Sequence, residues 1–184
     1  MPVKMLDYPA MLSHLELLHD EMEVTAAYER IAREIDRDYH TSNPVVITVL
    51  TGGMIPTIEI TNRLRIPLEL DFLHATRYQA QLSGGEIAWM VSPRIPIEGR
   101  NILIIDDILD EGDTLKAIVH FCQERKAANI RSVVLARKNQ PQKIQADYIG
   151  FTVPANRYLV GCGMDYRGHW RHLRAIYTLI DDPE

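Results

Sequence analysis

The sequence has few of the features that would place it outside the ordinary globular proteins. It contains only two cysteines, Cys122 and Cys162, which provide neither a disulfide framework nor a zinc-ligand spacing. No stretch approaches the roughly 18 consecutive apolar residues of a membrane helix. Residues 1–8 lack the apolar core of a signal peptide. We therefore expect a cytoplasmic protein without a membrane partner.

The sequence also lacks runs of lysine and arginine. It has 20 Lys and Arg against 25 Asp and Glu, for a net charge of −5, so no basic footprint for nucleic acid is present and we expect no such partner. Hydrophobic residues make up 46% and charged residues 24% of the chain, which is typical of a globular protein. We expect one domain spanning residues 1–184, since this length can bury a sizeable core.

The most informative segment lies between residues 101 and 115. The apolar run Ile102–Ile105 predicts a strand buried on both faces, and two aspartates follow it. Beyond Gly112, apolar residues at helical spacing predict a helix that ends near Arg125. In open α/β sheets, the loop between such a strand and helix lies where ligands bind.

This loop suits a ligand that carries phosphate and sugar groups. Backbone N–H groups at a helix N-terminus can receive a phosphate, and carboxylates accept hydrogen bonds from sugar hydroxyls or bind Mg²⁺. The acids would repel one another without a cation or donors. As an alternative, one acid caps the helix and others favour its positive end, but this does not explain an acid pair at the end of a buried strand. The five acids are Asp106, Asp107, Asp110, Glu111 and Asp113.

The pattern from Ile102 to Thr114 resembles the phosphoribosyl-diphosphate (PRPP) motif of type I phosphoribosyltransferases. That motif has four apolar residues, two acids, two apolar residues and then acid-x-Gly-x-Thr. The resemblance implies an α/β fold with a mostly parallel twisted sheet, flanking helices and a small hood. Many relatives carry Thr and Lys at the positions of Glu111 and Asp113, so backbone N–H groups and Thr114 are expected to contribute more to phosphate binding here. The residues implied to bind the ribose and 5′-phosphate are Asp106, Asp107, Asp110, Glu111, Gly112, Asp113 and Thr114.

A second strand, glycine loop and helix precede this segment. Val45–Leu50 predicts a buried strand, and a helix is expected from Met54 to about Leu64. The loop between them, which contains Thr51 and Gly52, can hold an anion. It resembles the loop that binds pyrophosphate in purine phosphoribosyltransferases, although some relatives have Lys where Thr51 stands.

A third strand is expected from Leu68 to His74, followed by a polar segment and a short strand over Ala88–Val91. The simple interpretation is a β-hairpin with a long turn. The segment Thr76, Arg77 and Tyr78 resembles the start of the flexible loop that closes over the active site in this family. Such a lid would exclude water from a reactive sugar cation.

The first forty residues carry no useful resemblance. Apolar spacing predicts a helical region from Tyr8 to His40, which ends before Asn43 and Pro44. We expect it to cover the core, or alternatively to form an interaction surface. We place the core at about residues 43–140 and expect the helices of residues 8–40 and the segment 141–184 to form or cover the hood.

The carboxy-terminal part begins after a strand predicted over Ser132–Ala136. Lys138 follows this strand and is either solvated or in contact with a ligand. Residues 147–171 contain aspartate-aromatic-x-Gly-aromatic, a proline, an aromatic residue and Val-Gly-x-x-x-Asp-Tyr. This order resembles the base-binding region of the hypoxanthine-guanine branch of the family.

The second resemblance assigns roles to individual residues. It implies that Tyr158 stacks on the purine, the Leu159 backbone contacts the base edge and Lys138 bonds the 6-oxo group. A shift of one residue would replace Lys138 by Arg137. Arg171 would reach pyrophosphate, and Asp165, beside the purine, would hold Mg²⁺ together with Asp106 and Asp107.

The resemblance implies transfer of 5-phosphoribose from PRPP to N9 of hypoxanthine or guanine, giving IMP or GMP and pyrophosphate. Mg²⁺ would be the cofactor, and the enzyme would be a homo-oligomer, either a dimer or a tetramer. Asp110 at the mouth of the loop is the candidate catalytic residue, as a general base or an orienting group. One alternative is a xanthine-preferring enzyme. The other is an RNA-binding regulator on the same fold, which the acidic net charge disfavours.

Overall fold

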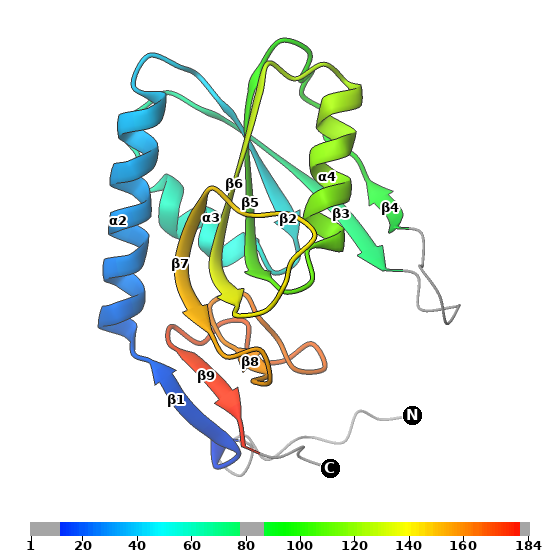
Figure 1. The fold of residues 1–184 in the computed structure, drawn as a ribbon. Helices are drawn as coiled ribbons and strands as arrows, with labels where there is room; N and C mark the ends of the chain where they lie inside the picture. Colours follow the sequence, from blue (N-terminus) through cyan, green and yellow to red (C-terminus); the bar gives the residue numbers. More distant parts are fainter. Residues whose placement is uncertain (1–11, 78–86, 181–184) are drawn as a thin grey trace, which may run out of the picture.

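The computed structural model describes residues 12–77 and 87–180 (Figure 1). Two sheets and three main helices make up this part of the chain. In chain order the elements are β1 (Leu15–His19), α2 (Glu21–Tyr39), β2 (Val45–Leu50), α3 (Met54–Thr61), β3 (Glu69–Arg77), β4 (Ile87–Val91), β5 (Asn101–Leu109), α4 (Asp113–Glu124), β6 (Asn129–Lys138), β7 (Tyr148–Val153), β8 (Leu159–Val160) and β9 (Ile176–Leu179).

The larger sheet has six strands in the order β4-β3-β2-β5-β6-β7. All neighbours are parallel except β3 and β4. The predicted apolar runs form its central strands, β2 and β5, because a parallel sheet with helices on both faces buries such strands completely. The predicted α/β architecture is confirmed, and Figure 1 shows the carboxyl ends of β2, β5 and β6 directed toward the smaller sheet.

The two faces of β5 pack against different helices. Leu103 and Ile105 belong to the core that includes residues of α2 and α3, whereas Ile102 and Ile104 pack with α4. Successive strand residues point to opposite faces, and all four side chains are fully buried. The same alternation sends Asp106 and Asp107, farther along β5, to opposite faces of the sheet.

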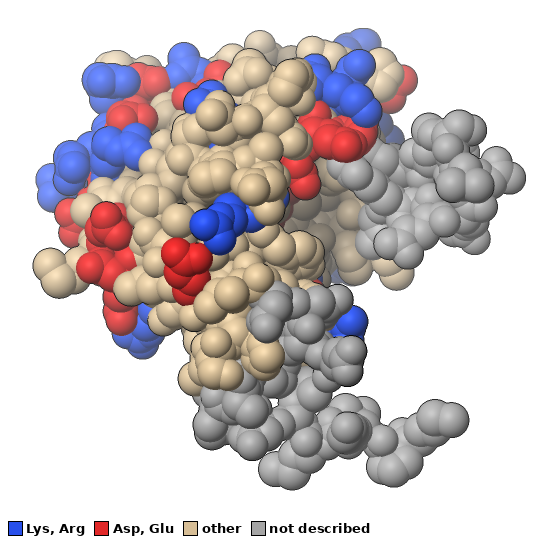
Figure 2. Space-filling view, turned by 60° about the horizontal axis from the view of Figure 1, so that its bottom comes forward, with Lys and Arg blue, Asp and Glu red and all other residues tan. Residues whose placement is uncertain are grey.

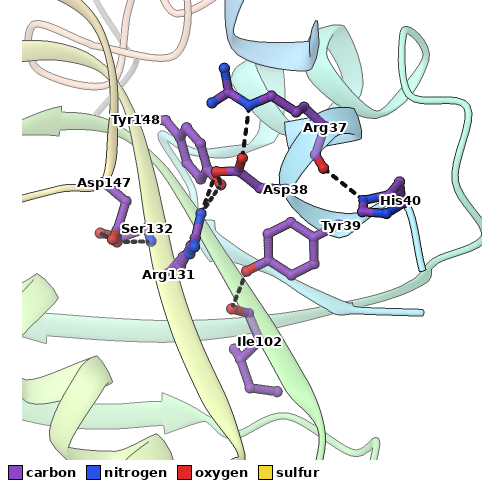
Figure 3. A network of polar contacts seen from close by, with 9 residues as sticks. All are labelled: Arg37, Asp38, Tyr39, His40, Ile102, Arg131, Ser132, Asp147 and Tyr148. Carbon is purple, nitrogen blue, oxygen red and sulfur yellow. Dashed lines mark hydrogen bonds and ion pairs between the residues drawn. The ribbon is translucent and has the colours of Figure 1, made fainter. Parts of the chain in front are cut away.

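A polar network fixes α2 to the amino ends of the strands (Figure 3). Arg131 of β6 bonds the Asp38 carboxylate and donates to the Tyr148 hydroxyl at 2.7 Å, while that hydroxyl donates to Asp38 at 2.8 Å. The bond from Tyr148 is the main reason why the pKa of Asp38 is lowered. Tyr39 adds a hydrogen bond to the Ile102 carbonyl at 3.4 Å. This edge is therefore held by internal bonds, and the opposite edge carries the exposed acids of the β5–α4 loop.

The smaller sheet, which we call the hood sheet, has the antiparallel order β1-β9-β8. The prediction of helix over Tyr8–His40 is wrong for β1, where Leu15 pairs with Leu179 and Leu17 with Tyr177. Tertiary packing outweighed the helical spacing of the leucines, because Leu15 packs onto a buried hood cluster. Residues 8–11 of that prediction lie outside the described residues.

Helix α2 starts at Glu21, one residue after Asp20, and a sequence signal marks this start. The Asp20 carboxylate accepts from the Glu23 N–H at 2.8 Å, and the Glu23 carboxylate accepts from the Asp20 N–H at 3.0 Å. This is a capping box. The spacing of an acid and a glutamate three residues later therefore marks a boundary that the apolar periodicity did not indicate.

Smaller differences concern the ends of other elements. Helix α3 ends at Thr61 rather than near Leu64, and β5 continues through both aspartates to Leu109. Strand β7 lies in the segment expected to form or cover the hood, but it is the outer strand of the larger sheet. Among the described helices, none is long and apolar enough to cross a membrane.

Candidate active site

The acid pair lies near the end of β5. Asp107 is buried and Asp106 is half-buried. The Asp106 carboxylate accepts from the Asp107 N–H at 2.9 Å, and the Asp107 carboxylate accepts from the Ile108 N–H at 2.7 Å. Loss of water and then the neighbouring Asp107 charge raise the pKa of Asp106 well above its usual range, and burial raises the pKa of Asp107. The pair is therefore suited to bind a cation or hydroxyl donors.

The loop after β5 forms a cavity of about 200 Å³ at the start of α4. Gly112 adopts a φ of 91° and is the N-cap of α4, without a side-chain cap bond. Asp113 is thus the first residue of the helix and not its cap. The first N–H groups of a helix have no partner within it, so this cavity can receive an anion. Its lining includes Asp106, Asp107, Asp110, Gly112 and Thr114.

Two glycine loops meet at Asp107. A Cβ atom on Gly52 would lie 2.1 Å from the Asp107 Oδ2 atom, and one on Gly163 would lie 2.0 Å from the Gly52 carbonyl oxygen. Contacts this short do not occur for real side chains, so both positions require glycine. The β2–α3 loop, the end of β5 and the hood loop around Gly163 are therefore in direct contact. The peptide bond between Leu50 and Thr51 in the first of these loops is cis, and Thr51 is exposed.

Arg171 links the hood loop to the acid pair. Its Nη1 atom donates to the Gly163 carbonyl at 2.5 Å and lies 4.0 Å from Asp107 Oδ2, and its Nη2 atom lies 2.5 Å from Asp165 Oδ1. The other oxygen of Asp165 accepts from the Gly168 N–H at 2.6 Å. A guanidinium held in this way presents positive charge between the hood and the acid pair.

Lys138 and Tyr158 lie on the hood side of the site. Lys138 is 9% exposed, and its ammonium donates to the carbonyls of Ala155, at 3.0 Å, and Arg157. Arg137 instead donates to the Thr152 hydroxyl at 2.9 Å. Lys138, not its neighbour, therefore faces the loop that leads to Tyr158. A lysine ammonium has three donors, so one can be offered to a ligand.

Tyr158 is 52% exposed. Its hydroxyl donates to the Asp165 carbonyl at 3.0 Å, and Tyr166 contacts it edge-on with centroids 5.8 Å apart. The ring is thus fixed while a large part of its surface remains accessible. Leu159, the next residue, is buried in β8.

The remaining predicted residues occupy different positions. Asp110 and Glu111 are exposed, and Thr114 is half-buried in the first turn of α4. Thr76 and Arg77 end β3, so they lie at the strand end and not in a loop, and Tyr78 lies outside the described residues. Figure 2, which brings the hood side forward, shows acidic side chains beside a hollow in this face.

The sequence interpretation missed the contacts that the segment after β6 makes with the loop after β5. Gln140 donates to Asp110 at 2.5 Å, and Lys143 donates to Asp113 at 2.6 Å. The role of Gly163 as a packing surface was also missed. The adjacency of two parallel strands could have indicated the first set of contacts, because their following loops leave the same edge of the sheet.

The carboxylates of Asp106 and Asp107 fit Mg²⁺ only as part of a coordination shell that water and substrate complete. The described residues contain no group of three or more His, Cys, Asp or Glu side chains that could hold a metal alone. Mg²⁺ usually binds through one or two carboxylates, with water and substrate phosphates completing its shell. Asp106 and Asp107 supply oxygen ligands of this kind, whereas the Asp165 carboxylate is engaged by Arg171.

Comparison with known proteins gives a consistent result. The model of the phosphoribosyl transferase domain family matches residues 14–167. The chain is 34% identical over 167 residues to a bifunctional protein TilS/HprT of Listeria monocytogenes, covering 89% of this chain but 26% of that protein. It therefore spans about a quarter of that relative. It is also 32% identical to a hypoxanthine-guanine phosphoribosyltransferase of Streptococcus pneumoniae, covering 89% of this chain and 91% of the relative.

Solved structures agree with the sequence comparisons. The structure of a hypoxanthine phosphoribosyltransferase from Staphylococcus aureus superimposes with a TM-score of 0.87 at 29% identity, covering 95% of this chain and 96% of the other. The Trypanosoma cruzi hypoxanthine phosphoribosyltransferase, solved in complex with the product IMP, gives a TM-score of 0.83 at 29% identity, covering 90% and 91% of the two chains. The similarity thus extends over almost the whole fold.

Proposed function

The chain belongs to the phosphoribosyl transferase family, and we propose that it transfers the 5-phosphoribosyl group of PRPP to N9 of hypoxanthine or guanine. The products are IMP or GMP and pyrophosphate. We further propose that residues 1–184 act as one phosphoribosyltransferase domain, which is supported by the match over residues 14–167.

The observation that carries this proposal is the contact of three loops at Asp107. One loop begins α4 and can receive a phosphate, one contains Gly52, and the third carries Gly163 and leads through Asp165 to Arg171. A substrate with a 5′-phosphate, a ribose and a diphosphate needs three such contacts from three directions. Their convergence on a buried carboxylate supports a ligand of this composition.

In this proposal, each part of PRPP has its own set of contacts. The 5′-phosphate binds the backbone N–H groups from Asp110 to Thr114, through Glu111, Gly112 and Asp113. Asp106 and Asp107 accept hydrogen bonds from the ribose hydroxyls. The diphosphate lies against Thr51 and Gly52, with Arg171 supplying positive charge.

Mg²⁺ bound by Asp106 and Asp107, with Asp165 near it, would neutralise charge on the diphosphate. The protein itself stabilises the charges that separate as the bond from C1′ to pyrophosphate breaks. Arg171 and the Gly52 loop hold the departing oxygens, and the acid pair faces the sugar cation. Asp110 takes the proton that N9 of the base loses when its bond to C1′ forms.

The purine lies against the hood. The exposed ring of Tyr158 stacks on the base, and the backbone of Leu159 contacts its edge. Lys138 donates to the 6-oxo group while its other donors hold the carbonyls of Ala155 and Arg157. A 6-amino group offers no acceptor to an ammonium, so adenine should be a poor substrate. Thr76, Arg77 and Tyr78 are proposed to begin a lid over this site.

We also propose that the protein forms a homo-oligomer, a dimer or a tetramer. Large apolar side chains are exposed on α3, β3 and β4, and such clusters usually mark contact surfaces. Light scattering should give a mass of at least twice that of one chain, and Phe72→Asp should lower it. The exposed residues are Met54, Ile58, Leu70, Phe72, Met90 and Val91.

One assay tests the proposed reaction. Purified protein is incubated with PRPP, Mg²⁺ and each of hypoxanthine, guanine, xanthine, adenine and uracil, and nucleotide formation is measured. We expect turnover with hypoxanthine or guanine, little with adenine, and none in EDTA. Preference for xanthine would change the proposed substrate but leave the proposed purine site unchanged, since Lys138 and Tyr158 suit any 6-oxopurine. A kcat/KM for adenine comparable to that for hypoxanthine would contradict the proposed contact of Lys138 with the purine.

A further inference from the structure

The phosphate loop carries negative charge where a phosphate is to bind. Asp110 and Glu111 precede the Gly112 cap of α4, and Asp113 follows it. Like charges close together repel, and the repulsion is strongest where water is partly excluded. Backbone N–H groups alone would therefore bind a dianionic phosphate against an unfavourable local field.

The segment after β6 supplies hydrogen-bond donors and a positive charge to this acidic loop. Lys143 Nζ lies 2.6 Å from Asp113 Oδ1, and the Lys143 backbone N–H donates to the Glu111 carbonyl at 2.9 Å. Gln140 donates to the Asp110 carboxylate at 2.5 Å. One short segment about thirty positions farther along the chain thus contacts the carboxylates of Asp110 and Asp113 and the backbone carbonyl of Glu111.

This segment also packs against the glycine of the loop. A Cβ atom on Gly112 would lie 3.2 Å from Ile144 Cγ2 and 3.4 Å from the Ile144 nitrogen. Strands β5 and β6 are parallel neighbours with Leu109 opposite Arg137, so both loops leave the same edge side by side. The contacts with Lys143 therefore follow from the topology and need no rearrangement of the sheet.

We propose that Lys143 is a positioning residue for the 5′-phosphate of PRPP. It neutralises Asp113 at the N-terminus of α4 and holds the Glu111 carbonyl, so that the loop donors face the phosphate with one fewer uncompensated negative charge beside them. This proposal rests on the proposed function. It adds a residue from outside the phosphate motif, and it explains how a loop with an acid at position 113 can bind an anion.

The test compares charge removal at Lys143 with the same charge removal elsewhere. Lys143→Met should raise KM for PRPP about 5- to 10-fold, the size expected for one partly screened charge. KM for hypoxanthine and kcat should stay within about 2-fold, because neither the base contacts nor the reacting groups change. Lys126→Met is the matched control, since Lys126 pairs with Glu98 beyond the carboxyl end of α4 and is 79% exposed.

A second set of variants separates charge neutralisation from simple loop shaping. Asp113→Asn alone keeps the backbone N–H proposed to bind the phosphate, and it should lower KM for PRPP because it removes the acid that Lys143 neutralises. The double variant Lys143→Met with Asp113→Asn should return KM for PRPP to within about 2-fold of wild type. A loop-shaping role predicts the opposite, with Asp113→Asn impaired and no rescue in the double variant. Either of those results would overturn the proposal.

PRPP binding to each protein, measured by calorimetry with Mg²⁺ and without purine, separates the two levels of inference. Wild-type protein that binds PRPP but transfers it to none of the bases would contradict the proposed function, while the affinity ratio of Lys143→Met to wild type still tests this residue. An active wild type with equal PRPP affinity in Lys143→Met would contradict the role of Lys143 alone.

Discussion

Replacement of Gly163 by alanine should disable the site without unfolding the protein. Gly163 has a φ of 108°, and an added Cβ would lie 2.0 Å from the Gly52 carbonyl oxygen and 3.2 Å from Asp107 Cβ. Real Cβ contacts are essentially never shorter than 3.0 Å, so the hood loop must retreat by at least the difference, 3.0 − 2.0 = 1.0 Å. The retreat also moves the carbonyl that Arg171 holds.

Two effects of this change can be separated by magnitude. A positive φ in a residue with a Cβ costs about 1–3 kcal/mol, and in a chain of this size Tm falls by about 2–4 °C per kcal/mol. A displacement of about 1 Å in a positioning group lowers catalysis by about 10²-fold. We therefore expect a moderate fall in Tm and a loss of kcat/KM of about two orders of magnitude.

Gly99→Ala is the matched control. Gly99 has a φ of 69°, but nothing lies within 4 Å of its added Cβ, so the variant has a similar backbone strain without the collision. Calorimetry should show a fall in Tm for both variants, larger for Gly163→Ala because of the collision, and steady-state kinetics should show a loss of activity for Gly163→Ala only. If Gly163→Ala retained kcat/KM within about 3-fold of wild type, the contact of the three loops would not be needed for catalysis.

Three further predictions address the base, the proton and the amino-end network. Tyr158→Ala should raise KM for the purine and not for PRPP, since stacking on a base contributes about 1–3 kcal/mol; the reverse result would misplace the purine. Asp110→Asn should lower kcat about 10²–10⁴-fold with KM for PRPP nearly unchanged, whereas a loop-shaping aspartate would leave kcat near normal. The pKa of Asp38 is lowered chiefly by its bond from Tyr148, so its stabilisation is complete above the unfolded pKa of about 4 and is lost as the pH falls below it. Asp38→Asn should therefore lower Tm at neutral pH, and the difference from wild type should shrink on acidification; a constant difference would argue against the ionised carboxylate.

The larger sheet could be predicted because the apolar pattern of each central strand is visible within the strand's own sequence. The run Ile102–Ile105 is apolar on both sides of the strand, and only a strand covered by helices on both faces explains it. The acid pair was also placed correctly at the carboxyl side of this run. The architecture and the position of the loop between β5 and α4 thus depend on residues that are neighbours in sequence.

Features that depend on distant partners could not be predicted in the same way. Strand β1 is stabilised by β9, at the other end of the chain, and its own spacing of leucines fits a helix equally well. The glycine at position 163 showed a tight bend, but the carbonyl of Gly52 that it contacts is more than a hundred residues away. Arg137 and Lys138 point to opposite faces of β6, because successive strand residues alternate. The sequence alone did not show which of the two faces each residue takes.

The pairing of β1 with β9 has a consequence for the order in which the two sheets form during synthesis. Residues 15–19 leave the ribosome early, but they have no strand partner until residues 176–179 have been made. At a synthesis rate of roughly 5–20 residues per second, this interval is on the order of ten to thirty seconds. The larger sheet and the loop between β5 and α4 can form within that time, because the strands of this sheet lie between residues 45 and 153. A nascent chain should therefore be able to form the larger sheet and the loop between β5 and α4 before it can form the hood sheet.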